Sequence, residues 1–156
     1  MQDISCGVSG SRLTLWSEQG IAEREERCLG VTVLDQSVVD LFRAIDSMDA
    51  PTFVKAFAVD GSFRFGNSEP AVGREQVEQN VSGFFSMIGG LSHEITGVWS
   101  GNWAGGEVKC VEAEVTYTRK DGTRTPVLPV TSTIRMEADR IKDYRIFMDA
   151  SPLFAQ

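Results

Sequence analysis

The hydrophobic period changes once along this chain, and that change constrains its fold more than any other feature. Before Gly89 the apolar residues recur at the spacing of a helix. The clearest helical stripe consists of Val77, Val81, Phe84, Phe85 and Ile88. After Gly90 the apolar residues alternate with polar ones at the two-residue spacing of a strand. Helices followed by a run of strands predict an α+β fold, with the helices packed on one face of a curved, mainly antiparallel sheet.

Three helices are expected before the change of period. The first begins near Asp35 and the second near Asp49, a residue type that caps helix N-termini. The third begins near Gly73 and ends at the glycine pair that follows Ile88. Strands are expected at 62–66, 92–99, 107–118, 127–136 and 140–149.

Length and composition predict one folded domain with a polar leader. The 156 residues are 42% hydrophobic and 24% charged, which suits a single core. We assign the domain to residues 31–156 and expect residues 1–30 to be a mobile leader, because they contain few apolar side chains. Cys6, Cys28 and Cys110 lie far apart without metal-like spacing, so we interpret them as reduced structural residues.

Charge and hydropathy argue against several classes of partner. The formal net charge of −7 works against nucleic-acid binding, because phosphate contacts need clustered Lys and Arg. No apolar run approaches the roughly 18 residues of a membrane span, and the first residues lack the pattern of a secretion signal. A cytoplasmic protein without membrane contact is therefore expected. The sequence shows no phosphate-binding loop and no metal-ligand spacing, so neither a metal nor another cofactor is predicted.

The last strand and tail place one carboxylate, Asp149, among large apolar residues. Burial disfavours the charged form of a carboxyl group and raises its pKa, which suits a general acid or base near neutral pH. The alternative is that Asp149 caps the final turn by bonding the backbone of Ala150 and Ser151 ahead of Pro152. The pattern of residues leaves both interpretations open.

A few segments carry a resemblance to a known family. They are Phe63-Arg-Phe-Gly-Asn67, then Gly73-Arg-Glu-Gln-Val-Glu-Gln79 with Gly83-Phe-Phe85, and finally Tyr144-Arg-Ile-Phe-Met-Asp149. From about Val38 to Phe154 the chain resembles the SnoaL-like proteins, and within their superfamily it is similar to the limonene epoxide hydrolases. The resemblance implies the cone-shaped fold of ketosteroid isomerases and nuclear transport factor two, with three N-terminal helices against a strongly curved sheet.

The resemblance also implies residues of an active site. Asp149 matches an aspartate at the end of the last strand that activates water in the epoxide hydrolases. Asn67 matches an asparagine that holds this water, although Phe65 stands where that family has a tyrosine. The family's Arg-x-Asp on a central strand reads Glu112-Ala-Glu114 here, so the arginine that links two carboxylates is missing.

The two glutamates have two opposite interpretations. In the first, Glu112, Glu114 and Asp149 share a pocket, and repulsion between like charges keeps one of them protonated unless Arg135 or Arg145 turns inward. The apolar face of the same strand then points outward and predicts a homodimer contact. That face consists of Val111, Ala113 and Val115. In the second, strand alternation alone places both glutamates in solvent.

Other side chains are assigned to substrate binding or to the core. His93, the only histidine, lies on an apolar strand face, where such a residue is more often structural than catalytic. A cone-shaped fold leaves its open end unfilled, so aromatic rings can line a ligand pocket. The predicted substrate-binding residues are Phe65, His93, Trp99, Phe84, Phe85, Arg145 and Phe147.

Together these residues predict a cofactor-free cyclase or isomerase that performs acid–base chemistry on an apolar polyketide- or terpenoid-like molecule. Asp149 is predicted to be the base, Glu114 the acid and Asn67 an orienting donor, with Glu112 beside them. The alternatives are an epoxide hydrolase and a non-catalytic module for ligand binding or dimerisation.

Overall fold

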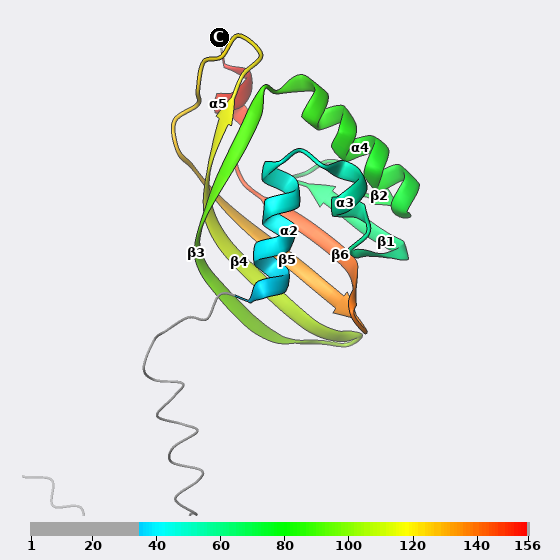
Figure 1. Ribbon diagram of the computed structural model, residues 1–156. Helices are drawn as coiled ribbons and strands as arrows, with labels where there is room; N and C mark the ends of the chain where they lie inside the picture. The colour runs from blue at the N-terminus through cyan, green and yellow to red at the C-terminus, as the bar shows by residue number, and fades with distance from the viewer. Residues whose placement is uncertain (1–34, 156) are drawn as a thin grey trace, which may run out of the picture. The chain divides into compact units, whose positions relative to one another are not determined.

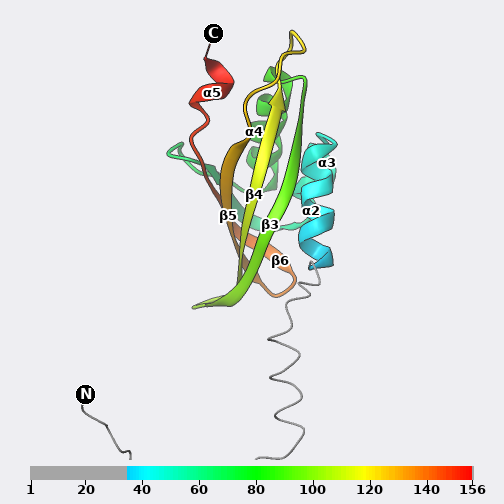
Figure 2. The same cartoon turned by 90° about the vertical axis from the view of Figure 1, so that its left-hand side faces the viewer.

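The computed structural model describes residues 35–155. Its six strands form one sheet with the order β2-β1-β6-β5-β4-β3 (Figure 1). The strands are β1 Phe57–Phe65, β2 Ala71–Val72, β3 Gly90–Trp103, β4 Gly106–Thr118, β5 Leu128–Glu137 and β6 Arg140–Phe147. All neighbouring strands pair antiparallel except β1 and β6, which run parallel. The sheet is therefore mainly antiparallel, and Figure 2 shows its long strands β3, β4 and β5 side by side.

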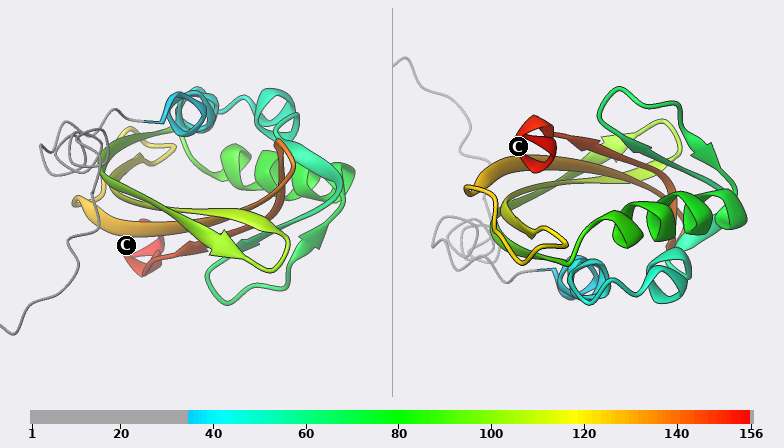
Figure 3. Two further views of the ribbon diagram at one scale, coloured as in Figure 1. Left: turned by 90° about the horizontal axis from the view of Figure 1, so that it is seen from below. Right: turned by 90° about the horizontal axis from the view of Figure 1, so that it is seen from above.

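Helices α2, α3 and α4 lie on one side of this sheet (Figure 3). They comprise Gln36–Asp46, Ala50–Val54 and Arg74–Met87, and a short helix α5, Ser151–Phe154, follows the last strand. The side chains of Asp35 and Asp49 accept hydrogen bonds from backbone N–H groups in the first turns of α2 and α3. These caps begin the two helices where the sequence predicted them.

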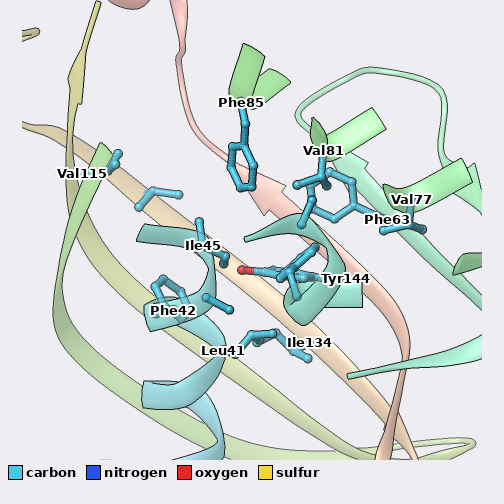
Figure 4. Close-up of a cluster of buried hydrophobic side chains, with 14 of the residues drawn as sticks. Leu41, Phe42, Ile45, Phe63, Val77, Val81, Phe85, Val115, Ile134 and Tyr144 are labelled. Atoms are coloured by element: carbon cyan, nitrogen blue, oxygen red, sulfur yellow. The ribbon is translucent and has the colours of Figure 1, made fainter. Parts of the chain in front are cut away.

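The sheet curves around the helices (Figure 3). The buried side chains between the two layers form the hydrophobic core. Figure 4 shows side chains from different elements meeting there, including Phe42 of α2, Phe85 of α4 and Tyr144 of β6. The predicted α+β, cone-shaped fold is confirmed. Its helical and strand segments follow the change of hydrophobic period that the sequence shows.

The two faces of β4 differ in burial. Val111, Ala113 and Val115 are buried in the core. Glu112 and Glu114 are exposed on the opposite face. The prediction that these glutamates face a pocket, and that the apolar residues form an outer dimer surface, is therefore wrong. The core needs the apolar face, because burying the two carboxylates there would cost their solvation.

A β-bulge in β3 determines the face on which Trp99 lies. The pairing of β3 with β4 shifts by one residue between Ile95 and Gly97. His93 consequently faces inward, whereas Trp99 pairs with Cys110, faces outward and is 57% exposed. Strict alternation would place both residues on one face, because it does not anticipate an inserted residue.

The predicted leader, residues 1–30, lies outside the described residues, and so do Cys6 and Cys28. Cys110 is a free thiol. Within residues 35–155, no helix combines the length and the apolar character needed to cross a bilayer.

Candidate functional site

A cavity of about 520 Å³ opens between α4, the turn after β1 and the inner face of the sheet. Its size is typical of small-molecule binding sites. Its lining includes a set of exposed residues that mark the mouth: Ser68, Gln79, Asn80, Gly83 and Met87. Among the described residues that line the cavity, none is Lys, Arg, Asp or Glu. The cavity therefore suits an uncharged and mainly apolar ligand.

Aromatic side chains form much of the cavity wall. The rings of Phe84 and Phe65 have centroids 5.6 Å apart, and Phe84 meets the ring of Tyr117 edge-on at 6.0 Å. Phe85 follows on α4, and Figure 4 shows its ring pointing into the buried cluster. Four of the residues predicted to bind substrate therefore line this cavity, namely Phe65, Phe84, Phe85 and His93.

His93 is held by a carboxylate that the sequence analysis did not identify. Its ring Nδ1 lies 2.6 Å from Oδ1 of Asp46, and its backbone N–H donates to Oδ2 of the same residue at 3.1 Å. Phe42 packs against the imidazole with ring centroids 5.1 Å apart. When Nδ1–H is donated to the carboxylate, Nε2 is left as an acceptor, and it bonds to no other described residue. The pair is thus an oriented base in the cavity wall.

The position of Asp46 is itself a signal in the sequence. Asp46 is the last residue of α2, where the helix dipole disfavours negative charge. An acidic residue at a predicted helix C-terminus therefore indicates a tertiary partner. The identity of that partner could not be inferred, because His93 lies 47 residues farther along the chain.

Tyr117 contributes a second polar atom to the wall. Its hydroxyl lies 3.4 Å from the sulfur of Met148, which is a weak acceptor. Burial raises the pKa of Tyr117 to about 12, so the hydroxyl keeps its proton at neutral pH. Tyr117 pairs with Leu91, and His93 is two residues farther along β3 on the same face. Tyr117 and His93 are therefore diagonal neighbours, one a proton donor and the other an acceptor.

The inner faces of β5 and β6 supply two buried hydroxyl groups. The hydroxyl oxygens of Ser132 and Tyr144 lie 3.3 Å apart, and these residues are only 2% and 1% exposed. Both line the cavity. Burial raises the pKa of Tyr144, so this phenol also stays protonated. A sequence signal for this pair exists, because Ser132 interrupts an apolar strand face between Val130 and Ile134.

Asp149 lies outside the cavity, in the segment between β6 and α5, and is exposed. Its Oδ1 accepts the backbone N–H of Ser151 at 2.9 Å, and this hydrogen bond lowers the pKa of the carboxyl group. The prediction of a buried Asp149 with a raised pKa is therefore wrong. Of the alternative, a cap on the final turn, the hydrogen bond from Ser151 is present, and Ala150 occupies the N-cap position of α5. Because β6 ends at Phe147, the chain leaves the sheet before it reaches Asp149.

Other predicted site residues also lie outside the cavity. They are Glu112, Glu114, Asn67, Trp99, Arg145 and Phe147. Asn67 is exposed in the turn after β1. Arg145 donates through Nε to Asp143 at 2.8 Å instead of turning inward. Phe147 is 52% exposed, and alternation along β6 places it on the outer face with Arg145. The residues that the sequence analysis assigned to one site are thus divided between the cavity and the outside of the sheet.

No group of three or more His, Cys, Asp or Glu side chains within residues 35–155 is arranged to hold a metal ion. The chemical groups that the cavity offers are therefore an imidazole, three hydroxyl-bearing side chains from the strands (Tyr117, Ser132 and Tyr144), and the polar residues at its mouth. This set can exchange protons and donate hydrogen bonds to a neutral ligand.

Several solved structures share this fold. A putative SnoaL-like polyketide cyclase from Jannaschia sp. CCS1 has a TM-score of 0.64 and 15% identity, and the match covers 76% of this chain and 87% of that chain. An LEH-like epoxide hydrolase from M. tuberculosis has a TM-score of 0.60 and 15% identity, with 76% and 84% covered. A hypothetical protein with a ketosteroid isomerase-like fold from Catenulispora acidiphila DSM 44928, solved in complex with trimethylamine, has a TM-score of 0.65 and 20% identity, with 76% and 89% covered.

At these identities the likeness to the solved structures concerns the fold alone. No curated protein shows significant sequence similarity to the chain. A family model described as the SnoaL-like domain matches residues 38–144, which is more than half of the sequence and confirms the predicted resemblance. The chain therefore belongs to the SnoaL-like domain family.

Proposed function

We propose that this protein is an acid–base enzyme that enolises an uncharged, apolar carbonyl compound, with His93 as the base. The observation that carries the proposal is the 2.6 Å contact between His93 Nδ1 and Asp46 Oδ1 in the wall of a largely apolar cavity. A carboxylate in this position orients the imidazole and stabilises the imidazolium ion that forms when Nε2 takes a proton.

The reaction begins with transfer of a proton from the carbon next to the substrate carbonyl to Nε2 of His93. The electron pair of that C–H bond moves toward the carbonyl oxygen, which becomes an enolate oxygen and accepts a hydrogen bond from Tyr117. Where a carbon–carbon double bond adjoins the deprotonated carbon, the imidazolium then returns the proton to the far end of that double bond. The double bond moves into conjugation with the carbonyl group, which completes an isomerisation. In a cyclisation, the enolate carbon attacks a second carbonyl carbon of the same molecule, and the imidazolium protonates the new alkoxide. Neither route consumes a co-reactant.

The lining of the cavity supports a polyketide- or terpenoid-like substrate. Its aromatic wall favours an apolar body, and its described lining residues include no charged side chain that would pair with an ionic group. The Jannaschia neighbour is named as a putative polyketide cyclase, which is the same substrate class. Polyketides also carry the spaced carbonyl groups that an enolate cyclisation requires.

Solvent exchange tests the assignment of the base. In D₂O the wild-type protein should accelerate exchange of the α-protons of 2-tetralone, an apolar ketone, as followed by NMR. His93→Gln should lower this rate by about 10² or more, the usual contribution of a general base. Asp46→Asn should lower it as well, because the ring loses its orientation. Asp149→Asn changes a carboxylate outside the cavity and should leave the rate unaltered. Equal rates for the wild type and His93→Gln would contradict the proposal.

Epoxide hydrolysis is the alternative reaction, and the fold shared with the LEH-like hydrolase favours testing it. Asp149 and Asn67, which the sequence resemblance assigns to water activation, both lie outside the cavity. An apolar epoxide incubated in ¹⁸O-labelled water distinguishes the reactions, because hydrolysis places the label in a new hydroxyl group. Binding of both ketone and epoxide without exchange or labelling would favour a non-catalytic binding module.

A homodimer is also proposed, with its contact on the outer face of the sheet. Trp99 and Phe147 are 57% and 52% exposed there, and exposed aromatic residues are typical of interfaces. Trp99→Ser should shift the dimer toward monomer in sedimentation, whereas Val72→Ser, at the opposite edge of the sheet, should not. A wild-type protein that is monomeric at micromolar concentration would contradict this. A cytoplasmic location stays a prediction.

A further inference from the structure

The hydroxyl groups of Ser132 and Tyr144, here called the floor pair, offer one more proton than the described residues accept. Each hydroxyl carries one O–H, and either can donate to the other. Their mutual hydrogen bond uses one of these protons, and no other described residue accepts from either oxygen. Both residues are nearly fully buried and line the cavity. The O–H that the pair does not use is therefore available to an acceptor atom inside the cavity.

The surrounding rings fix the position of the floor pair. The ring of Tyr144 packs among those of Phe53, Phe57 and Phe63, with centroid distances of 5.8, 6.3 and 5.6 Å. Figure 4 shows the Tyr144 oxygen directed toward the middle of the buried cluster. The low exposure of Ser132 and Tyr144 contrasts with the exposed residues of the mouth. A ligand that enters by the mouth therefore reaches the floor pair with its leading end.

We propose that the floor pair is a subsite for a neutral carbonyl oxygen at the leading end of the substrate. A carbonyl oxygen accepts the remaining proton and offers no donor of its own to satisfy. A carboxylate would be buried without a cation, since no Lys or Arg of the described residues lines the cavity, and a hydrocarbon would leave the donor unpaired.

The subsite narrows the substrate class of the proposed function. It rests on that function for the identity of the substrate's reactive end. His93 and Tyr117 act on one carbonyl group, and the floor pair binds another. The substrate is therefore a neutral, apolar molecule with at least two separated carbonyl groups. Such a molecule is the expected product of an enzyme class that joins ketide units or oxidises a ring system to ketones.

A matched pair of ligands tests the subsite without turnover. 2-Acetylnaphthalene and 2-isopropenylnaphthalene differ by C=O in place of C=CH₂ and have nearly the same shape. Calorimetry gives the ratio of the alkene Kd to the ketone Kd. In the double variant Tyr144→Phe/Ser132→Ala this ratio should fall about 3- to 10-fold from its wild-type value, the usual net contribution of one neutral hydrogen bond. Thr131→Val, on the exposed outer face of the same strand, is the control and should keep the wild-type ratio.

A ratio in the double variant within twofold of the wild-type value would overturn the subsite. If the double variant does not fold, the single variants decide, because at least one of them should lower the ratio about threefold. The exchange assay with 2-tetralone separates this proposal from the proposed function. If exchange is absent but the Kd ratio depends on the floor pair, only the proposed function is refuted. If exchange is normal but the Kd ratio does not depend on the floor pair, only the subsite is refuted.

Discussion

The inner and outer faces of β4 share one backbone but have opposite environments. Val115 and Tyr117 point inward and contribute to the core and the cavity wall, whereas Glu112 and Glu114 point into solvent. Because side chains alternate along a strand, an error in choosing the inner face moves every residue of the strand at once. The site is therefore built on the apolar face of the sheet, and the carboxylate that orients His93 is Asp46, which comes from helix α2.

The carboxylate of the candidate site differs from the two glutamates in how its charge is balanced. Asp46 lies at the end of α2 and accepts hydrogen bonds from both the ring and the backbone of His93. Glu112 and Glu114 form no ion pair with a described residue within 4.0 Å and remain solvated. Asp46 therefore supports His93 from outside the cavity lining, and its hydrogen bonds to His93 replace part of its water shell.

The largest expected effect comes from placing a charge on the inner face. Val115→Glu should destabilise the fold by about 4 kcal/mol or more, because it buries an unpaired carboxylate in the core. Thr116→Glu, the next residue on the outer face, should change the free energy of unfolding by less than about 1 kcal/mol. Urea unfolding measures both. A Val115→Glu protein that stays folded and only dissociates from a dimer would restore the outward assignment of this face.

Much of the fold could be predicted from the sequence because its signals are local. The change from helical to strand period separates α2 to α4 from the long strands β3 to β6, and the caps Asp35 and Asp49 mark where two helices begin. The bulge between Ile95 and Gly97 has no comparable signal, since it depends on pairing with another strand. Trp99 was misplaced for this reason.

The site was less predictable because it depends on contacts between distant segments. Phe65, Phe84, Phe85 and His93 were identified from aromatic content and strand position, and they line the cavity. The Asp46 to His93 contact joins residues 47 positions apart, which no periodicity reveals. The assignment of the carboxylates failed because the resemblance gives only their positions along the chain. Whether a carboxylate faces the cavity or solvent depends on which strand face is buried and on where the strand ends.

A second prediction concerns Lys109, the charged exception on the inner side of β4. Its Nζ lies 2.6 Å from Oδ2 of Asp35 and donates to Ser37 Oγ at 2.9 Å. Asp35→Asn keeps the helix cap but leaves a largely buried ammonium group without its main partner. The variant should lose about 2 kcal/mol of stability in urea unfolding. The double variant Asp35→Asn/Lys109→Met should recover most of the loss, and an absence of recovery would contradict the role given to the ion pair.

The stability due to this ion pair should also depend on pH. Hydrogen bonds from Lys109 and Ser37 lower the pKa of Asp35 to about 2 from an ordinary value of 3.8. A carboxyl group with a lowered pKa in the folded state contributes stability that is fully present above its unfolded value and lost as the pH falls through the folded value. The difference between wild type and Asp35→Asn should therefore be constant above about pH 4 and shrink between about pH 4 and pH 2. A constant difference across this range would contradict the assignment.

A smaller effect is expected at the tail. Asp149→Ala removes the acceptor of the Ser151 N–H and should lower the melting temperature slightly, because the segment before α5 loses this hydrogen bond. Solvent exchange of 2-tetralone should be unchanged, because Asp149 lies outside the cavity. Asp149→Asn can keep the hydrogen bond from Ser151 through its amide oxygen and should behave as wild type in both measurements. A large fall in exchange with either variant would return Asp149 to the role that the sequence analysis gave it.

The smallest effect is expected from Glu114→Gln, which removes one charge from the outer face. Glu114 is exposed, so its carboxylate is already solvated and its loss should change the free energy of unfolding by no more than about 0.5 kcal/mol. The exchange rate should also match that of wild type, although the sequence analysis made this residue the acid. Lowering of the exchange rate by tenfold or more, in a protein that unfolds at the wild-type urea concentration, would mean that Glu114 reaches the substrate. Such a result would place the reaction on the outer face of the sheet, opposite the cavity that Tyr117 lines.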